Sequence, residues 1–166
     1  MRSDVESVVN ASPLIFLGKL GELDLLPEPV ATTLIVLDKI RARNPEQHAE
    51  IDLINTVVDQ GRIQPIQADP DRLPHNLANI HEGESSVLAL ALEREIDEVI
   101  LDDKTAIQAA KTLDLSPVST PFLLLRSARR GDLTSGGFER RLDRLLELGY
   151  YLSPKLYERL KEAAED

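Results

Sequence analysis

The stretch VILDDKTA, residues 99–106, joins a short apolar segment to two adjacent carboxylates, Asp102 and Asp103. The apolar segment is rich in β-branched residues, as is typical of a buried parallel strand, and residues 103–113 have helical periodicity. Two negative charges at a strand-to-helix junction repel each other unless water, a helix N-terminus or a cation compensates them. A helix cap needs only one acid, whereas a hard divalent cation such as Mg²⁺ binds several oxygen ligands. The junction therefore predicts a helix cap, a metal site, or both.

Strands and helices alternate outward from this junction in both directions. Ser12, followed by Pro13, is expected to cap the first helix, and Ser153 followed by Pro154 is expected to open the last one. This alternation predicts a three-layer α/β/α sandwich around a central parallel sheet, with a helical C-terminal tail. The expected strands are 6–10, 62–67, 98–101 and 116–120, with an edge position for 62–67 because it contains a proline. The expected helices are 12–20, 33–43, 46–61, 82–95, 103–113, 121–131, 138–149 and 153–165, with a short helical turn within 22–29 and a loop at 69–80.

The composition is that of an ordinary globular protein: 42% of the 166 residues are hydrophobic and 29% are charged. The absence of cysteine excludes disulfides, thiolate metal sites and a cysteine nucleophile. No apolar stretch reaches the length of a membrane span, and the first ten residues do not form a signal peptide. We expect a soluble, cytoplasmic protein without membrane contact. Its 166 residues are expected to form one domain, with a core at about 5–131 and a helical extension at about 132–166.

The charge is unevenly distributed along the chain. The formal net charge is −10, which disfavours nucleic acid as a partner of the whole surface. Residues 1–125 contain 21 acids and 10 bases, whereas residues 126–161 contain 9 bases and 5 acids. The basic segment forms either a solvated helix face or a patch that contacts phosphates. Most of its positive charge comes from Arg126, Arg129, Arg130, Arg140, Arg141 and Arg144.

Further polar residues stand near the expected strand ends. Asn10 ends the first strand, and Glu84 follows Gly83 in the first turn of the apolar helix 82–95. In a parallel sheet, ligands bind at the carboxyl ends of the strands, so Asn10 and Asp102 converge if their strands are neighbours. Glu84 is explained either by the helix dipole or by a metal site. The sequence has no phosphate-binding glycine loop, no G-x-S-x-G and no H-E-x-x-H motif.

Three segments resemble a branch of the PIN-domain family that is related to VapC-type toxin ribonucleases. They are VVNASPLIFLGKLGELDLL at 8–26, GESSVLALALE at 83–93 and VILDDKTAIQAAKTL at 99–113, and the tail LLELGYYLSPKLYERLKEA at 145–163 is also similar. The resemblance implies an RNA-cutting enzyme that uses Mg²⁺ or Mn²⁺ held by clustered acids. The family's positions fall on Asn10, Glu84, Asp102 and Asp103 as metal ligands and catalytic residues, with Ser12 beside them. Ser12, Arg126, Arg129 and Arg130 are the candidate RNA contacts.

The chain departs from the family pattern at three positions. Asn10 replaces an acid, Lys39 stands where a second acid is usual (Asp38 is adjacent), and Ile107 replaces a common basic residue. Two functions therefore remain open: a metal-dependent endoribonuclease of the toxin type, or a PIN-like module that binds RNA or a protein without cutting. The resemblance also implies a cognate antitoxin protein and a homodimer as partners. The apolar residues of the tail, by contrast, are expected to pack on their own domain: Phe138, Leu142, Leu145, Leu146, Tyr157 and Leu160.

Overall fold

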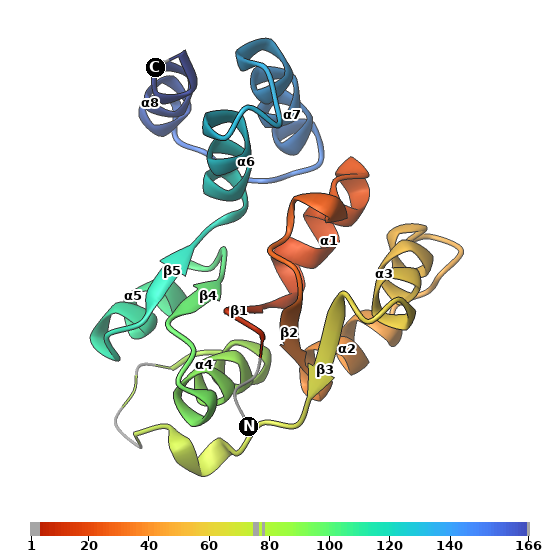
Figure 1. Ribbon diagram of the computed structural model, residues 1–166, viewed down its shortest axis with the longest axis vertical. Helices are drawn as coiled ribbons and strands as arrows, with labels where there is room; N and C mark the ends of the chain where they lie inside the picture. Colours follow the sequence, from red (N-terminus) through yellow and green to blue (C-terminus); the bar gives the residue numbers. More distant parts are fainter. Residues whose placement is uncertain (1–3, 75–76, 78, 166) are drawn as a thin grey trace.

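The computed structural model describes residues 4–74, 77 and 79–165, and its strands form one parallel sheet. The strand order is β3-β2-β1-β4-β5, so β3 and β5 are the edges and β1 lies at the centre (Figure 1). Val8 of β1 pairs with Val99 of β4, which confirms that the first strand and the strand before Asp102 are neighbours. The strands are β1 (Ser7–Val9), β2 (Val30–Thr33), β3 (Ile63–Ile66), β4 (Glu98–Ile100) and β5 (Ser116–Val118).

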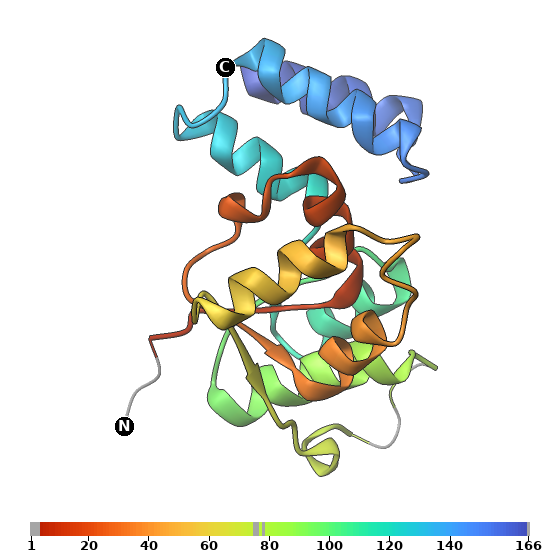
Figure 2. The same cartoon turned by 90° about the vertical axis from the view of Figure 1, so that its right-hand side faces the viewer.

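Helices cover both faces of this sheet, which confirms the three-layer α/β/α class. Helices α2, α4 and α5 lie on one face, and α1 and α3 lie on the other (Figure 2). Helices α6, α7 and α8 pack on one another and extend the second layer beyond α1. The helices are α1 (Ala11–Leu20), α2 (Leu34–Arg41), α3 (Glu50–Asp59), α4 (Glu82–Arg94), α5 (Lys104–Thr112), α6 (Thr120–Arg129), α7 (Ser135–Glu147) and α8 (Pro154–Glu165), with 3₁₀ turns η1 (Leu23–Leu25) and η2 (Pro70–Arg72).

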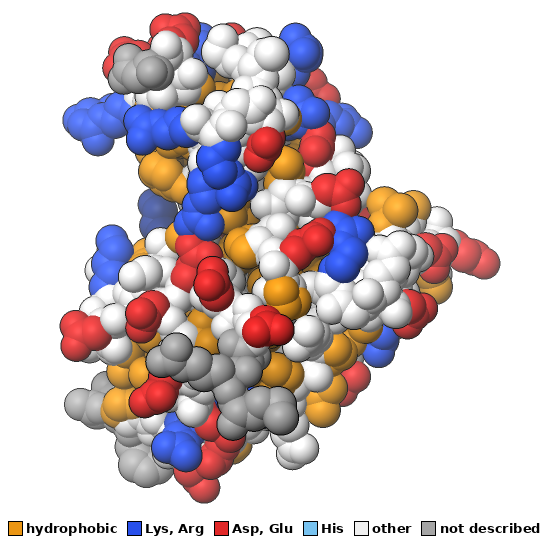
Figure 3. All heavy atoms as spheres, viewed as in Figure 1, with side chains coloured by type: hydrophobic (Ala, Val, Ile, Leu, Met, Phe, Trp, Pro, Cys, Tyr) orange, Lys and Arg blue, Asp and Glu red, His pale blue; other side chains and the backbone are white. Residues whose placement is uncertain are grey.

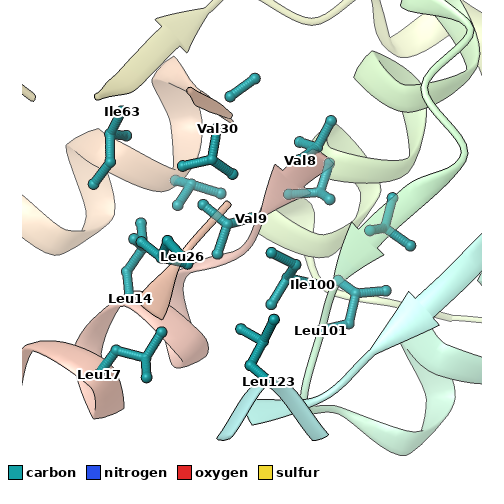
Figure 4. Close-up of a cluster of buried hydrophobic side chains, with 14 of the residues drawn as sticks. Val8, Val9, Leu14, Leu17, Leu26, Val30, Ile63, Ile100, Leu101 and Leu123 are labelled. Carbon is teal, nitrogen blue, oxygen red and sulfur yellow. The ribbon is translucent and has the colours of Figure 1, made fainter. Parts of the chain in front are cut away.

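The core lies on both faces of the sheet, and one part of it lies between the sheet and the layer formed by α1 and α6. Apolar side chains of the three central strands meet those of the two helices, as Figure 4 shows, and burial of this surface is the main stabilising term. Gly18 is required where α1 meets α3, because a Cβ atom there would stand 2.9 Å from the Cβ atom of Glu50. The labelled core residues are Val8, Val9, Leu14, Leu17, Leu26, Val30, Ile63, Ile100, Leu101 and Leu123.

Two local expectations were wrong. Strand β2 was not expected: residues 30–32 were assigned to no element and Thr33 to a helix, whereas Thr33 is both the last residue of the strand and the cap of α2, accepting a hydrogen bond from the Val36 amide at 3.1 Å. No turn residue separates the two elements. Ser12 does not cap α1, which begins at Ala11 after Asn10, because its hydroxyl is hydrogen-bonded to another side chain.

The C-terminal helices pack on their own chain, as expected. Phe138, Leu142 and Leu145 are fully buried and Leu160 is 2% exposed, whereas Leu146 is 40% exposed. Ser153 accepts a hydrogen bond from the Leu156 amide at 3.1 Å, so the predicted start of α8 is confirmed. Among the residues described, no helix is long and apolar enough to cross a membrane.

Candidate functional site

The candidate site lies at the carboxyl ends of β1 and β4. The Asn10 amide N–H donates to the Ile100 carbonyl at 3.0 Å, which fixes the end of β1 against the end of β4. Asp102 follows two residues later, and its carboxylate accepts from the Ser12 hydroxyl at 2.8 Å. The neighbouring strands thus bring the residues after β1 and after β4 together, as the sequence predicted.

Asp102 is the most heavily hydrogen-bonded carboxylate of this site. Besides Ser12, its oxygens accept from the Thr120 amide and hydroxyl, both at 2.8 Å, and from the Tyr150 hydroxyl at 2.7 Å. These four donors occupy the four lone-pair directions of a carboxylate. Burial, and then the charge of Asp102 and the hydrogen bond to it, raise the pKa of the Tyr150 phenol far above its ordinary value. Asp102 therefore ties β4 to α1, α6 and the segment before α8.

Asp103 has a different role. Its Oδ2 accepts from the Ala106 amide at 2.9 Å, so Asp103 is the N-cap of α5, and its side chain is exposed. At least one of the paired aspartates was expected to cap this helix, and this expectation is confirmed. Because its other oxygen accepts no hydrogen bond from the described residues, Asp103 keeps one carboxylate oxygen open to solvent.

Asn10 and Glu84 are the unusual pair of the site. Asn10 is 7% exposed and Glu84 is 9% exposed, yet neither side chain has a hydrogen bond or ion pair within the part of the chain that the structure describes. The oxygens of both side chains are therefore available to a cation or to water. Both residues adjoin Gly83, since Asn10 Oδ1 lies 3.5 Å from the position that a Cβ atom of Gly83 would take.

Lys39 extends into the same region. Its Nζ lies 3.8 Å from that Cβ position, so the ammonium and the Asn10 amide oxygen lie on the same side of Gly83. Lys39 and Asp38 are both exposed in the last turns of α2, and neither forms an ion pair with any described residue. The residue that replaces the usual family acid thus points toward the site.

The candidate RNA contacts are split between two places. Ser12 belongs to the site, where it donates to Asp102. Arg126 instead pairs with Glu98 at the amino end of β4, while Arg129 and Arg130 line a separate pocket with Phe122. The structure therefore does not bring the arginines to the acidic site.

The donors present fit one partly hydrated hard cation. Mg²⁺ is commonly held by one or two carboxylates and keeps several waters, and Glu84 and Asn10 supply one free carboxylate and one free amide oxygen. Within the described ranges no group of three or more His, Cys, Asp or Glu residues is placed to hold a metal ion. The Asp102 oxygens, moreover, already accept four hydrogen bonds. Only Glu84 and Asn10 are therefore considered as protein ligands of such a cation.

Sequence reasoning missed Thr120 and Tyr150. Thr120 follows the end of β5, so the rule that polar residues gather at strand ends could have identified it. Tyr150 lies 48 residues beyond Asp102 and has no local sequence signal.

Comparison with known families agrees with this architecture. The family model DUF3368, described as a PIN domain, matches residues 6–166, and the chain belongs to this family. A search of curated proteins finds no match.

Proposed function

We propose that the protein is a metal-dependent endoribonuclease of the VapC toxin type, which hydrolyses phosphodiesters of RNA. The observation that carries this proposal is the burial of Glu84 and Asn10 without protein partners at the sheet's carboxyl edge. Membership of a nuclease fold family supports it. Mg²⁺ or Mn²⁺ is the cofactor whose ligand preference matches these oxygens.

Each residue has a separate role in this proposal. Glu84 and Asn10 hold the cation, which when bound stabilises charge on the phosphate and acidifies a water molecule. Asp103, with one oxygen open to solvent, accepts a proton from the attacking water. Asp102 orients Ser12 and the start of α6 through its four hydrogen bonds, and Ser12 reaches the substrate from this position.

A second candidate function is favoured by Lys39. A PIN-like module that binds RNA or a protein partner without cutting would need no metal. An ammonium beside Asn10 and Gly83 opposes the binding of a divalent cation. The saturated hydrogen bonding of Asp102 also favours this candidate, because that carboxylate has no free lone pair for a metal ion.

The compartment, the oligomeric state and the partners of the protein are also part of this proposal. We infer that residues 1–166 act as one domain in the cytoplasm, as a homodimer, with RNA as substrate and a cognate antitoxin protein as inhibitor. Among the described residues of the tail, Leu146 on α7 and Tyr151 are exposed apolar side chains that could contribute to such a dimer.

The test is cleavage of a fluorescently labelled single-stranded RNA with and without Mn²⁺. We expect Mn²⁺-dependent cleavage that Glu84→Gln lowers at least about a hundredfold, because the variant removes the charged ligand. Glu82→Gln is the matched control, since Glu82 lies in the same helical turn but is exposed. RNA binding without cleavage in the wild type would support the non-cutting module instead.

A further inference from the structure

A pocket of about 430 Å³ lies between the edge strand β5 and helix α6, apart from the acidic site. Figure 3 shows this face hollowed between the C-terminal helices and the β5 edge, where apolar and basic side chains meet. The pocket combines an apolar floor with guanidinium groups, a combination that no part of the proposed chemistry uses. Its lining residues are Pro117, Val118, Phe122, Leu125, Arg126, Arg129 and Arg130.

The outer edge of β5 is poorly suited to pairing with another strand. The Ser116 amide donates to Asp97 at 2.7 Å and the Val118 carbonyl accepts from Leu101 at 2.9 Å, so both residues direct their backbone groups toward β4. The residue between them, Pro117, has no N–H to offer on the outer side. An occupant of the pocket is therefore bound by side chains.

The basic side chains of the pocket are not equivalent. Arg126 is fixed by its ion pair with Glu98, so it forms part of the wall. Arg129 uses only Nε, in a 3.4 Å hydrogen bond to the Ala163 carbonyl, and forms no ion pair with any residue that the structure describes. Arg130 lies 3.7 Å from Asp132, and both side chains are more than half exposed, so water and salt weaken this contact. Arg129 and Arg130 thus keep donors for an anion.

Phe122 supplies an exposed aromatic face. Its side chain is 44% exposed in the first turn of α6, two residues after Thr120, which donates to Asp102. Arg129 lies about 10 Å further along the helix at 1.5 Å per residue. A chain that leaves the acidic site along α6 would therefore meet an aromatic ring first and guanidinium groups next.

We propose that this Phe122–arginine pocket is a subsite for single-stranded RNA, with a base stacked on Phe122 and a phosphate bound by Arg129 and Arg130. An aromatic face beside cationic side chains is the arrangement with which proteins bind single strands without sequence preference. An acidic peptide would use the arginines but gains less from the flat, open ring. The inference rests on the proposed function, because it assumes that the protein acts on RNA.

The test is fluorescence anisotropy with a labelled 12-nucleotide single-stranded RNA, without metal, so that the strand is not cleaved. Arg129→Gln/Arg130→Gln should weaken binding about tenfold and reduce the slope of log K against log salt by about one to two. Phe122→Leu keeps an apolar side chain but removes the ring, and it should weaken binding about tenfold with an unchanged salt slope. The matched control is Arg140→Gln/Arg159→Gln, which removes the same charge from exposed positions on α7 and α8 and should bind like the wild type.

The outcomes separate this inference from the proposed function. Wild-type binding that Phe122→Leu leaves unchanged, or that the control weakens as much as Arg129→Gln/Arg130→Gln does, overturns the subsite and leaves the nuclease proposal standing. A glutamate-rich peptide that binds more tightly than RNA, and loses affinity in the same two variants, overturns it in favour of a protein partner. No RNA binding by the wild type overturns the subsite, whereas the nuclease proposal is overturned by the absence of Mn²⁺-dependent cleavage.

Discussion

Replacing Lys39 by methionine should strengthen the binding of Mn²⁺ about tenfold. Methionine keeps the length and apolar stem of the side chain but removes its charge. The Lys39 ammonium and Asn10 Oδ1 lie 3.8 and 3.5 Å from one point beside Gly83. A divalent ion bound at Asn10 would therefore be repelled by a positive charge that no ion pair within the described residues offsets.

The magnitude follows from Coulomb's law. At a separation on the order of 7 Å, the repulsion between a divalent ion and an ammonium is about 1.2 kcal/mol at the dielectric constant of water, and about four times larger near a dielectric constant of 20. Because Lys39 is exposed and can move away, the smaller value applies, and it corresponds to roughly a sevenfold to tenfold change in affinity. Lys39→Glu should have a larger effect, since it also adds a carboxylate ligand.

The affinity is measured by titrating the protein with Mn²⁺ and recording the free ion by electron paramagnetic resonance. Lys19→Met is the control, because Lys19 is exposed in the last turn of α1, at the opposite end of that helix from Asn10. Equal affinities of Lys39→Met and Lys19→Met would refute the reasoning. A Glu84→Gln variant that binds Mn²⁺ like the wild type would show that the ion is bound elsewhere.

Three further variants test the structure around the site. Tyr150→Phe should lower the free energy of unfolding by about 1.5–3 kcal/mol in urea, because Asp102 loses one charged hydrogen bond; an unchanged value would mean that water replaces the hydroxyl fully. Burial alone would raise the pKa of Glu98, but hydrogen bonds and the charge of Arg126 bring it below its ordinary value. This ion pair therefore stabilises the fold above about pH 4.5 and is lost as the pH falls, so Arg126→Gln should lose less stability than the wild type between pH 5 and pH 3. Gly83→Ala should retain the fold, since its Cβ would meet only ordinary contacts, yet weaken Mn²⁺ binding by filling the space beside the unpartnered side chains; equal Mn²⁺ affinity would place the ion elsewhere.

Local signals were sufficient for most of the fold. The apolar segment before Asp102 and the Ser153–Pro154 start of α8 identified their elements, because each depends on residues close in sequence. Strand β2 was not predicted because its four residues lead directly into α2, and Thr33 belongs to the strand and also caps the helix. Without a glycine or proline between them, no local signal separates residues 30–32 as a strand from the helix expected at 33–43.

The sequence predicted where Asn10 and Asp102 lie but not which hydrogen bonds their side chains form. Strand ends located Asn10 and Asp102, since neighbouring parallel strands end at one edge of a sheet. Residues distant in sequence determine which carboxylate accepts its full set of hydrogen bonds and which does not. Tyr150, for example, lies 48 positions from Asp102. The direction of Lys39 depends likewise on the packing of α2 against α4.

Binding of a divalent ion near Glu84 should also change the stability of the fold. The Glu84 side chain is 9% exposed and has no hydrogen-bond or ion-pair partner among the described residues, so a cation bound there would stabilise the folded state. Lys39 forms no ion pair with Glu84, but its ammonium is tethered to α2 and lies with Asn10 Oδ1 beside Gly83, so it opposes a divalent ion bound there. A divalent ion should therefore bind less tightly to the wild type than to Lys39→Met. We expect 5 mM Mn²⁺ to raise the melting temperature of Lys39→Met by several degrees more than that of the wild type, by linkage of binding to folding. Equal shifts in the two proteins would show that the Lys39 charge does not oppose the binding of the ion.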